Sequence, residues 1–317
     1  MNNKKKLIVL VGPTAVGKTK ASIKIAKTFN CEIISGDSMQ IYNGMDIGTA
    51  KIRPDEMEGI PHHLLDIRDP RESFSVAEFQ EAVRKKIHQI TERGSIPLLV
   101  GGTGLYVQSV LYDYQFTEMD NDPVYRKQLE ERAALGEGPK LYKELQTVDP
   151  RSAQSIHPHN IKRVIRALEI HHLTGMKKSD RPTAKQDDLL YDAAVIGLTM
   201  EREKLYKRIN KRVDLMMEEG LLQEVKYFYE QGIRDVPSVQ AIGYKELYLY
   251  LDGSLTLEQA VELLKKNTRR FAKRQFTWFR NKMDVKWFDM TNEGEHLNQI
   301  EQIIHFIAGK LQIKANT

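Results

Sequence analysis

One short segment of this sequence has the residue types and the spacing of a phosphate-binding loop. It follows the apolar run Leu7 to Val11 and precedes a stretch with helical periodicity, which is the strand–loop–helix context that such a loop requires. Its residues are Gly12, Pro13, Thr14, Ala15, Val16, Gly17, Lys18 and Thr19. We expect backbone N–H groups and the start of the helix to bind phosphate oxygens, with Lys18 adding a point charge and Thr19 binding Mg²⁺.

A glycine-rich turn used only for packing is the alternative interpretation of this segment. It leaves Lys18 unexplained, because a lysine at a helix N-terminus meets charge of its own sign unless an anion binds there. The loop alone does not name a reaction, since kinases, motors, switches and some transferases share it.

Asp37 lies in an acidic turn, Ser35 to Ser38, about one βα unit after the loop. An aspartate facing the reacting end of a phosphate-bearing substrate can bind the metal ion or act as a general base, and the sequence does not separate these roles. The third interpretation is a turn residue that caps the segment Ser38 to Tyr42.

The C-terminal third of the chain contains a basic helical pattern between Thr256 and Arg280. Its apolar positions have helical spacing and predict a packed face: Leu257, Val261, Leu264, Thr268 and Phe271. The remaining surface is cationic: Lys265, Lys266, Arg269, Arg270, Lys273 and Arg274. This pattern indicates either a solvated charged face or a surface for a polyanion such as RNA. The nearby aromatic residues Phe276, Trp278 and Phe279 are expected in the core.

A second basic cluster follows the apolar run Ala193 to Leu198. Its members are Arg202, Lys204, Lys207, Arg208, Lys211 and Arg212. Arg208 and Arg212 are four residues apart and so share a helix face, from which both could bind the anion held by the phosphate loop. Surface pairing with Glu201, Glu203 and Asp214 is the alternative.

The order of the expected elements indicates an α/β fold, a P-loop NTPase-like parallel sheet flanked by helices. The strand-like runs are Leu7–Val11, Glu32–Ser35, Ile96–Val100, Ala193–Leu198 and Val285–Phe288. Right-handed crossovers would bring the phosphate loop, Asp37 and Gly101 to Gly104 to one edge of this sheet. Residues 113–190 lack strand-like runs, so we expect a core of residues 1–112 and 191–317 with an inserted helical domain at 113–190.

Composition narrows the class of protein. The chain has 317 residues, 41% of them hydrophobic, and a formal net charge of +5, as in an ordinary soluble protein that tolerates a polyanionic partner. Its single cysteine, Cys31, excludes an intrachain disulfide and a cysteine-based zinc site. Without a signal peptide or an apolar run of membrane-spanning length, we expect a cytoplasmic protein, and by default a monomer.

Several long strings together resemble the tRNA dimethylallyltransferase family, of the bacterial type. They are GPTAVGKT (12–19), SGDSMQIYNGMDIGTAK (35–51), PHHLLDIRDP (61–70), LLVGGTGLY (98–106), NIKRVIRALEI (160–170), QAIGYKE (240–246) and RRFAKRQFTWFR (269–280). The resemblance implies transfer of a dimethylallyl group from dimethylallyl diphosphate to the N6 amine of the adenosine 3′-adjacent to the anticodon in tRNA, releasing pyrophosphate. The loop would then hold an isoprenoid diphosphate rather than ATP, with Mg²⁺ as cofactor.

The implied reaction suggests roles for individual residues. Because the adenine amine is a poor nucleophile, we expect Asp37 to be the base that takes its proton, while Lys18, Arg208 and Arg212 offset the charge on the departing diphosphate. The resemblance places Thr103 beside the target nucleotide. The tRNA anticodon stem-loop would contact Asp37, Ser38, Met39, Gln40, Thr103, Arg126, Ile161, Lys162, Arg163, Val164, Ile165, Gln240, Ala241, Ile242, Gly243, Tyr244 and Lys245. To reach the loop, the adenine must leave its stack. The zinc finger of eukaryotic relatives is absent, since Cys31 is the only cysteine.

Two other classes of function fit the motifs. A P-loop kinase acting on a small molecule or nucleotide would use Asp37 to activate a hydroxyl and the insertion as a lid, and would turn over ATP without RNA. An RNA-binding protein or nucleotide-dependent switch would need the basic surfaces but not Asp37. Replacing Asp37 with alanine separates this last class from an enzyme.

Overall fold

A computed structural model of the chain describes residues 4–114, 116, 122–180 and 188–315. Contacts within the chain divide it into two compact units, Met1–Asp113 with Gln186–Thr317, and Tyr114–Lys185. Each unit has its own hydrophobic core.

The first unit is built on a six-stranded sheet in which every pair of neighbouring strands is parallel, in the order β3-β2-β4-β1-β5-β6. The strands are β1 (Lys6–Val11), β2 (Cys31–Ser35), β3 (His62–His63), β4 (Ile96–Gly101), β5 (Asp192–Thr199) and β6 (Lys286–Asp289). The α/β prediction is therefore confirmed, and its five strands are present. The sixth, β3, escaped prediction because two residues carry no periodicity.

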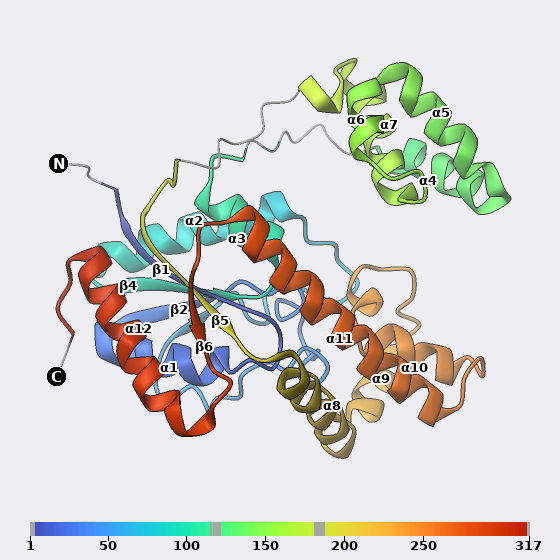
Figure 1. Cartoon of the computed structure of the whole chain (residues 1–317). Coiled ribbons are helices and arrows are strands. Elements are labelled where there is room, and N and C mark those ends of the chain that lie inside the picture. The colour runs from blue at the N-terminus through green and yellow to red at the C-terminus, as the bar shows by residue number, and fades with distance from the viewer. Residues whose placement is uncertain (1–3, 115, 117–121, 181–187, 316–317) are drawn as a thin grey trace. The chain divides into compact units, whose positions relative to one another are not determined.

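Helices cover both faces of this sheet (Figure 1). One face packs on α1 (Lys18–Phe29) and α12 (His296–Leu311), and the other on α2 (Val76–Glu92) and α3 (Gly104–Leu111). Strands β1, β4 and β5 are buried on both sides, which explains their nearly continuous apolar sequence.

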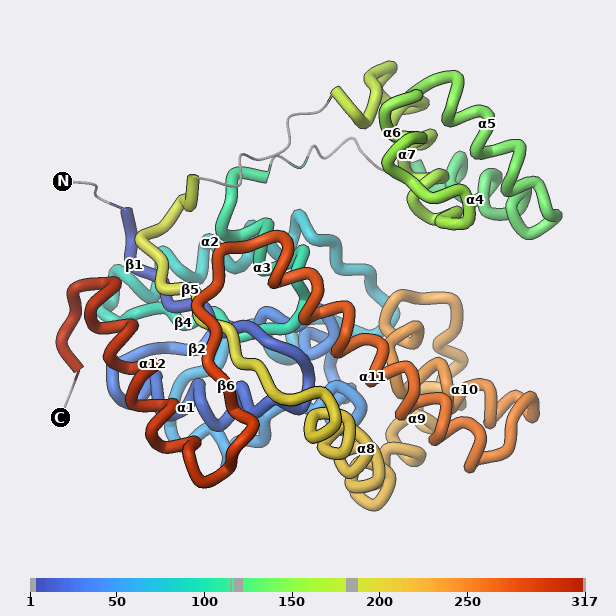
Figure 2. The backbone as a smooth tube through the Cα atoms, in the orientation of Figure 1, coloured from blue at the N-terminus to red at the C-terminus, as the bar shows by residue number. Residues whose placement is uncertain are grey.

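Four further helices of the first unit form a separate packed group. They are α8 (Arg202–Glu218), α9 (Leu221–Glu230), α10 (Tyr244–Leu251) and α11 (Leu257–Lys282). Figure 2 shows α11 running from α9 and α10 back to the sheet. Thr256 begins α11 with a capping box, its hydroxyl accepting the Gln259 N–H. The short helices η3 (Ser238–Gln240) and η4 (Glu293–Glu295) complete this unit.

The second unit is helical. It comprises α4 (Pro123–Arg132), the π-helical turn η1 (Ala133–Glu137), α5 (Gly138–Val148), α6 (Pro150–Ser155), α7 (Ile161–Thr174) and η2 (Lys178–Asp180). Leu129, Leu141, Leu145, Val164 and Leu168 form its core. The expected helical segments Tyr125–Leu135 and Ile161–Leu173 both coincide with helices. In the part of the chain that the structure describes, no helix is both long and apolar enough to cross a bilayer.

Candidate functional site

The phosphate-binding loop joins β1 to α1 at the carboxyl edge of the sheet. Its backbone is left-handed at Ala15 (φ 65°) and Gly17 (φ 107°), which turns the chain sharply before the helix. The Lys18 ammonium donates to the carbonyls of Gly12 at 2.9 Å and Pro13 at 2.8 Å. Burial lowers the pKa of Lys18 from 10.5 to about 8, and the neighbouring Arg212 charge adds to this while Asp37 opposes it.

The turn that carries Asp37 lies directly against the end of β4. The Gly36 N–H donates to the Val100 carbonyl at 2.7 Å. A Cβ on Gly101 would lie 2.4 Å from the Gly36 oxygen, closer than real Cβ contacts, so only glycine fits there. This close approach brings the Asp37 turn to Thr103, whose hydroxyl oxygen lies 3.4 Å from the Ser38 nitrogen.

Asp37 is both a turn residue and a cavity residue. Its carboxylate accepts the Met39 N–H at 2.9 Å, which confirms the turn interpretation. The same side chain lines a cavity at the carboxyl edge of the sheet. Burial raises the pKa of Asp37, opposed by the Met39 hydrogen bond and the Lys18 charge, which makes this carboxylate a stronger base than an exposed one.

The cavity has two halves that share a wall. The half that we call the phosphate half has a volume of about 540 Å³, and the apolar half has about 300 Å³. Residues on the shared wall line both halves: Thr14, Ala15, Asp37, Thr49, Ala50, Arg212 and Phe271. Asp37 therefore borders both halves.

Cations line the phosphate half. Lys18 and Lys20 lie at the start of α1, and Arg208, Lys211 and Arg212 belong to α8. Arg208 and Arg212 thus line the same half as the loop, and their binding of an anion there stays a prediction. Burial lowers the pKa of Arg212, while the Asp37 charge opposes this shift. A site with this charge fits a polyanionic group such as a diphosphate.

Apolar side chains of several helices line the other half, together with residues near Asp37. The helical ones are Ile209, Val213, Met216, Leu221, Leu264 and Phe271. The residues of the shared wall line this half too, together with Ser38, Met39, Gly48, Thr103, Thr268, Arg274 and the segment 240–243. This half fits a flat or branched apolar group with one polar edge toward Asp37 and Thr103.

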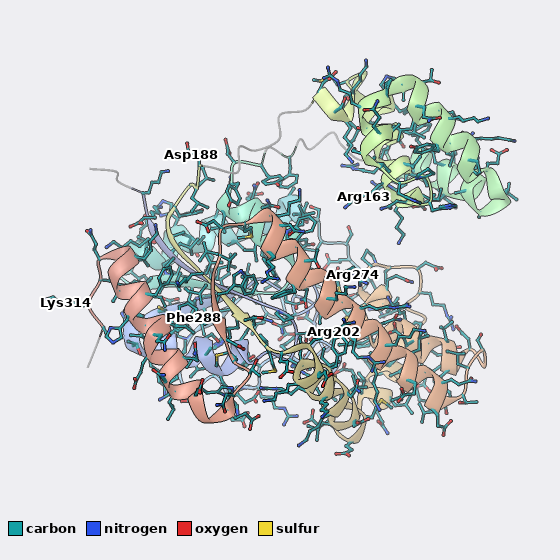
Figure 3. All side chains as sticks on the ribbon, in the orientation of Figure 1. Arg163, Asp188, Arg202, Arg274, Phe288 and Lys314 are labelled. Atoms are coloured by element: carbon teal, nitrogen blue, oxygen red, sulfur yellow. The ribbon has the colours of Figure 1, made fainter. Side chains whose placement is uncertain are left out.

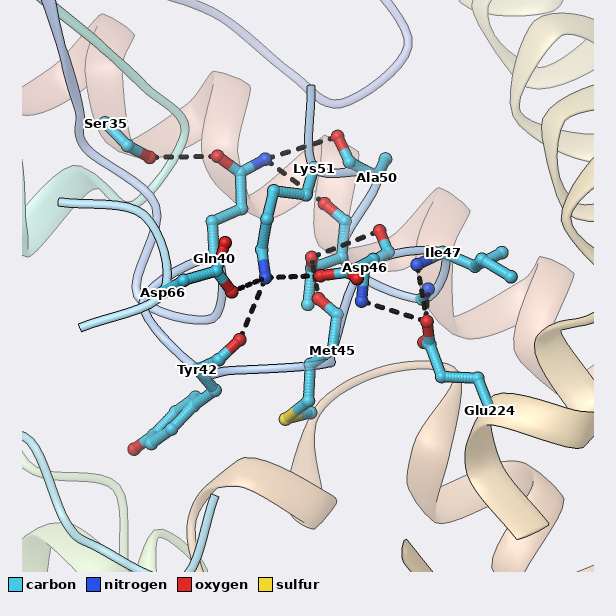
Figure 4. Close-up of polar contacts among 12 residues, drawn as sticks. Ser35, Gln40, Tyr42, Met45, Asp46, Ile47, Ala50, Lys51, Asp66 and Glu224 are labelled. Carbon is cyan, nitrogen blue, oxygen red and sulfur yellow. Dashed lines mark hydrogen bonds and ion pairs between the residues drawn. The ribbon is translucent and has the colours of Figure 1, made fainter. Parts of the chain in front are cut away.

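A hydrogen-bond network holds in place the segment that contains Thr49 and Ala50 (Figure 4). The Gln40 amide accepts from the Ser35 hydroxyl at 2.9 Å and donates to the carbonyls of Thr49 at 3.2 Å and Ala50 at 3.3 Å. Because Gln40 uses both ends of its amide here, its side chain supports the cavity wall in this structure.

Glu224 and Lys51 hold the same loop from outside. The Glu224 carboxylate accepts three successive backbone N–H groups, of Asp46, Ile47 and Gly48, at 2.8–3.0 Å (Figure 4). The Lys51 ammonium, on a side chain only 5% exposed, pairs with Asp46 and Asp66. Such a connected network makes the loop a rigid part of the cavity.

Comparison with known proteins identifies the family of this chain. The family model described as IPP transferase matches residues 40–282. The chain belongs to the IPP transferase family. A tRNA dimethylallyltransferase of Anoxybacillus flavithermus is 59% identical over 98% of this chain and 99% of its own length, and one of Bacillus cereus is 60% identical over 99% and 98%.

Solved structures of IPP transferase relatives have the same fold. The full-length tRNA isopentenylpyrophosphate transferase of Bacillus halodurans has a TM-score of 0.75 and 55% identity, covering 98% of this chain and 97% of that chain. A eukaryotic dimethylallyltransferase described as acting on tRNA has a TM-score of 0.81 and 35% identity, covering 94% and 77%.

Three residues expected at the tRNA have buried side chains. Val164 and Ile165 pack in the second unit, and Tyr244 packs in the first, where its hydroxyl donates to Glu224 at 2.5 Å. Apolar side chains enclosed by their own core cannot contact RNA from these positions, so the neighbouring exposed residues are the better candidates.

The other expected tRNA contacts vary in exposure. Lys162 and Arg163 are exposed on α7, where Figure 3 labels Arg163, and Ile161 is half-buried. Arg126 donates to the buried carboxylate of Glu169 at 2.6 Å. Gln240, Ala241, Ile242 and Gly243 line the apolar half, and half-buried Lys245 lies just beyond them in the chain.

The basic residues of α11 form two groups, those that contact α8 and those that are exposed to solvent. Lys265 pairs with Asp214 at 2.7 Å, and the Arg269 guanidinium donates to Asn210 at 2.6 Å, so these two cations bind α8. The exposed cations are Lys266, Arg270, Lys273 and Arg274. Figure 3 shows Arg274 on α11 and Arg202 at the start of α8, where Arg202 stacks over Tyr206. Phe279 is buried as expected, whereas Phe276 and Trp278 are half-buried.

His62 and Gln275 are among the cavity residues that were not anticipated from the sequence. His62, on the edge strand β3, lines the phosphate half, and burial lowers its pKa. Gln275 of α11 lines the same half. Both stand within matched strings, PHHLLDIRDP and RRFAKRQFTWFR, which was the available signal.

The residues around the phosphate half offer few ligands for Mg²⁺. Among the described residues, no group of three or more His, Cys, Asp or Glu could hold a metal ion. The Thr19 hydroxyl is exposed and lines the phosphate half. These residues fit an ion that arrives with a diphosphate and takes most of its ligands from phosphate oxygens and water, as Mg²⁺ commonly does.

Proposed function

We propose that this protein transfers a dimethylallyl group from dimethylallyl diphosphate to the N6 amine of the adenosine 3′-adjacent to the anticodon in tRNA, releasing pyrophosphate. The observation that carries the proposal is the shared wall at Asp37, which joins a cationic half to an apolar half. Membership of the IPP transferase family supports the same reaction.

The phosphate half would bind the diphosphate. The amides of the loop, Lys18, Arg208 and Arg212 offer positive charge to an anion that gains charge as the allylic C–O bond breaks. A Mg²⁺ ion bound by Thr19 and the diphosphate would supply further charge neutralisation to the leaving group. Preorganised cations of this kind stabilise the transition state more than the ground state.

The apolar half would receive the target adenine, with its amine toward the shared wall. The adenine amine is a poor nucleophile, because its lone pair is delocalised into the ring. A carboxylate that accepts an N–H hydrogen bond and then the proton promotes its attack on the allylic carbon. Asp37 would be this base, and the Thr103 hydroxyl, on the Ser38 side of the turn, would orient the amine.

Binding of tRNA would use exposed cations on both units. Lys162 and Arg163 are exposed on α7, and Lys266, Arg270 and Lys273 are exposed on α11. Lysine and arginine bind the phosphate backbone without reading sequence. Because the acceptor amine must reach Asp37 inside the cavity, the adenosine would flip out of the anticodon-loop stack.

The direct test is pyrophosphate release by the full chain with Mg²⁺ and unmodified tRNA carrying adenosine at that position. Parallel reactions contain dimethylallyl diphosphate or ATP, each with and without RNA. We expect release that requires both the RNA and the isoprenoid. Turnover of ATP without RNA, with an inert isoprenoid, would overturn the proposal in favour of a kinase.

A further inference from the structure

The Gln275 side chain connects two loops of the cavity. Gln275 lies in α11 and is 5% exposed. Its amide oxygen accepts the Thr14 N–H at 2.9 Å, and its amide nitrogen donates to the Gly102 carbonyl at 3.0 Å. One amide thus holds one N–H group of the phosphate-binding loop and one carbonyl of the loop before Thr103.

These two loops leave neighbouring strands. In the β1–β4 ladder the last paired residues are Val11 and Gly101, so Thr14 and Gly102 lie beyond its end. Beyond that ladder, the described residues include no backbone hydrogen bond between loop 12–17 and loop 102–103. The Gln275 amide therefore supplies a link that the sheet itself does not provide.

Gly102 leaves room for this contact. A Cβ at this position would lie 2.2 Å from the Gln275 amide nitrogen, so a larger residue would have to displace the amide. Gly102 does not have a left-handed backbone, so its conformation does not require glycine.

The remainder of α11 is fixed to the elements on either side. Trp278 packs against Gly104 at the start of α3, and the Gln108 amide of α3 donates to the Lys282 carbonyl at 3.2 Å. Thr103 immediately precedes α3, so α11 and Thr103 share a rigid support.

The N-terminal half of α11 reaches a third loop of the cavity. The Asn267 amide donates to the Glu246 carboxylate at 2.7 Å, and that carboxylate accepts the Gly243 N–H at 2.7 Å. Gly243 lines the apolar half. One helix therefore contacts the loops that form both halves.

We propose that Gln275 is a positioning residue that sets the spacing between the phosphate-binding loop and Thr103, and thereby aligns the diphosphate with the acceptor amine. The inference rests on the proposed function. Only a side chain with a donor and an acceptor in amide geometry satisfies both partners. A displacement of about 1 Å between reacting groups can cost about 100-fold in rate.

Two variants of the full chain test this role. Gln275→Met keeps the approximate size of the side chain and removes both hydrogen bonds without adding charge. Gln275→Glu keeps the shape but loses the donor when ionised, and regains it when the introduced carboxyl is protonated. Gln302→Glu, at an exposed position of α12, is the matched control. The readouts are the single-turnover rate at saturating substrates, the Kd of inorganic pyrophosphate, and Tm.

We expect Gln275→Met to lower the single-turnover rate about 10- to 100-fold while the Kd of pyrophosphate changes less than about threefold. The rate of Gln275→Glu relative to wild type at the same pH should rise as pH falls from about 8 to about 6. Gln302→Glu should match wild type at every pH. The pH rescue separates positioning from loss of structure.

A wild-type rate in Gln275→Met, or a rate deficit of Gln275→Glu that does not change with pH, would overturn the inference. So would a loss of pyrophosphate affinity equal to the loss of rate in Gln275→Met, because that result indicates collapse of the phosphate loop. If wild-type protein fails to use RNA and dimethylallyl diphosphate, the proposed function fails and the positioning inference falls with it. If wild-type protein is active and both Gln275 variants match it, only the inference about Gln275 fails.

Discussion

The phosphate half of the cavity is built around loops at the carboxyl ends of β1, β2 and β4, whereas the apolar side chains of the other half come largely from α8, α9 and α11. A backbone cradle tolerates few residue types, since glycines, a lysine and a threonine must occupy fixed positions. An apolar wall tolerates many, because hydrophobic residues of similar volume replace one another at small cost. The residues of the phosphate half can therefore be recognised in the sequence, whereas those of the apolar half cannot.

The two halves should also respond differently to substitution. Changes at the cations of the phosphate half should alter the affinity for pyrophosphate, and changes in the apolar half should alter only the affinity for the larger substrates. Replacing Asp37, at the shared wall, should alter the rate while the affinity for pyrophosphate is kept. The largest effect is expected at the shared wall and the smallest in the apolar half.

Asp37→Asn at the shared wall should give the largest effect. Asparagine can still accept the Met39 N–H and keep the turn, but it cannot take a proton. We expect the single-turnover rate to fall about 10²- to 10⁴-fold with the Kd of pyrophosphate nearly unchanged. In wild type, the rate should fall as pH drops through the raised pKa of Asp37, because only the ionised carboxylate is a base. A loss below about tenfold would remove Asp37 from the role of base.

Lys18→Met should give the next largest effect, in the phosphate half. Loss of a charge-assisted contact worth about 1.5–3 kcal/mol corresponds to about 10- to 150-fold weaker binding of pyrophosphate. Isothermal titration calorimetry with pyrophosphate measures the affinity of the variant and of wild type. Lys24→Met, at an exposed position on the same helix, is the control. Equal affinities in Lys18→Met and wild type would contradict the assignment of this half.

Titration of Lys18 should make the affinity for pyrophosphate depend on pH. Only the protonated amine attracts the anion, and the bound anion raises its pKa above the free value of about 8. Above pH 8 the advantage of wild type over Lys18→Met should therefore shrink, by at most about tenfold per pH unit. Below pH 8 the ratio of the two Kd values should be constant. A ratio that stays constant up to pH 10 would show that Lys18 keeps an ordinary pKa.

Met216→Ala should give the smallest effect, in the apolar half. Removing part of the apolar wall costs about 0.8 kcal/mol per CH₂ no longer covered, so we expect KM for tRNA or dimethylallyl diphosphate to rise about 3- to 10-fold. Kd for pyrophosphate should stay at the wild-type value, because Met216 lines only the apolar half. Equal losses of affinity for pyrophosphate and for the larger substrates would contradict the distinction between the two halves.

Features governed by local rules were predictable from the sequence. Strand periodicity and the glycine-rich loop located β1 and the phosphate site, and parallel topology brought Asp37 and Thr103 to the same edge. Tertiary contacts could not be predicted from these local rules. Gln275 bonds two loops more than 170 positions away along the chain, and its neighbours in sequence are cations and aromatic residues that attract attention first.

Buried residues within the matched strings show a second limit. The QAIGYKE string placed Tyr244 at the tRNA, yet Tyr244 is fully buried and its hydroxyl helps Glu224 to fix loop 46–48. A motif records that a residue type is required at a position. It does not separate a requirement of the substrate from one of the core, and only the packed structure makes that distinction.

The most direct test of the shared wall is identification of the product on RNA. An anticodon stem-loop with adenosine 3′-adjacent to the anticodon is incubated with dimethylallyl diphosphate and Mg²⁺, digested to nucleosides and analysed by mass spectrometry, beside a stem-loop with guanosine at that position. We predict one dimethylallyl group on the N6 atom of that adenosine, no modification of the guanosine stem-loop, and almost none by Asp37→Asn. An unmodified adenosine despite pyrophosphate release, or modification at another nucleotide, would contradict the account.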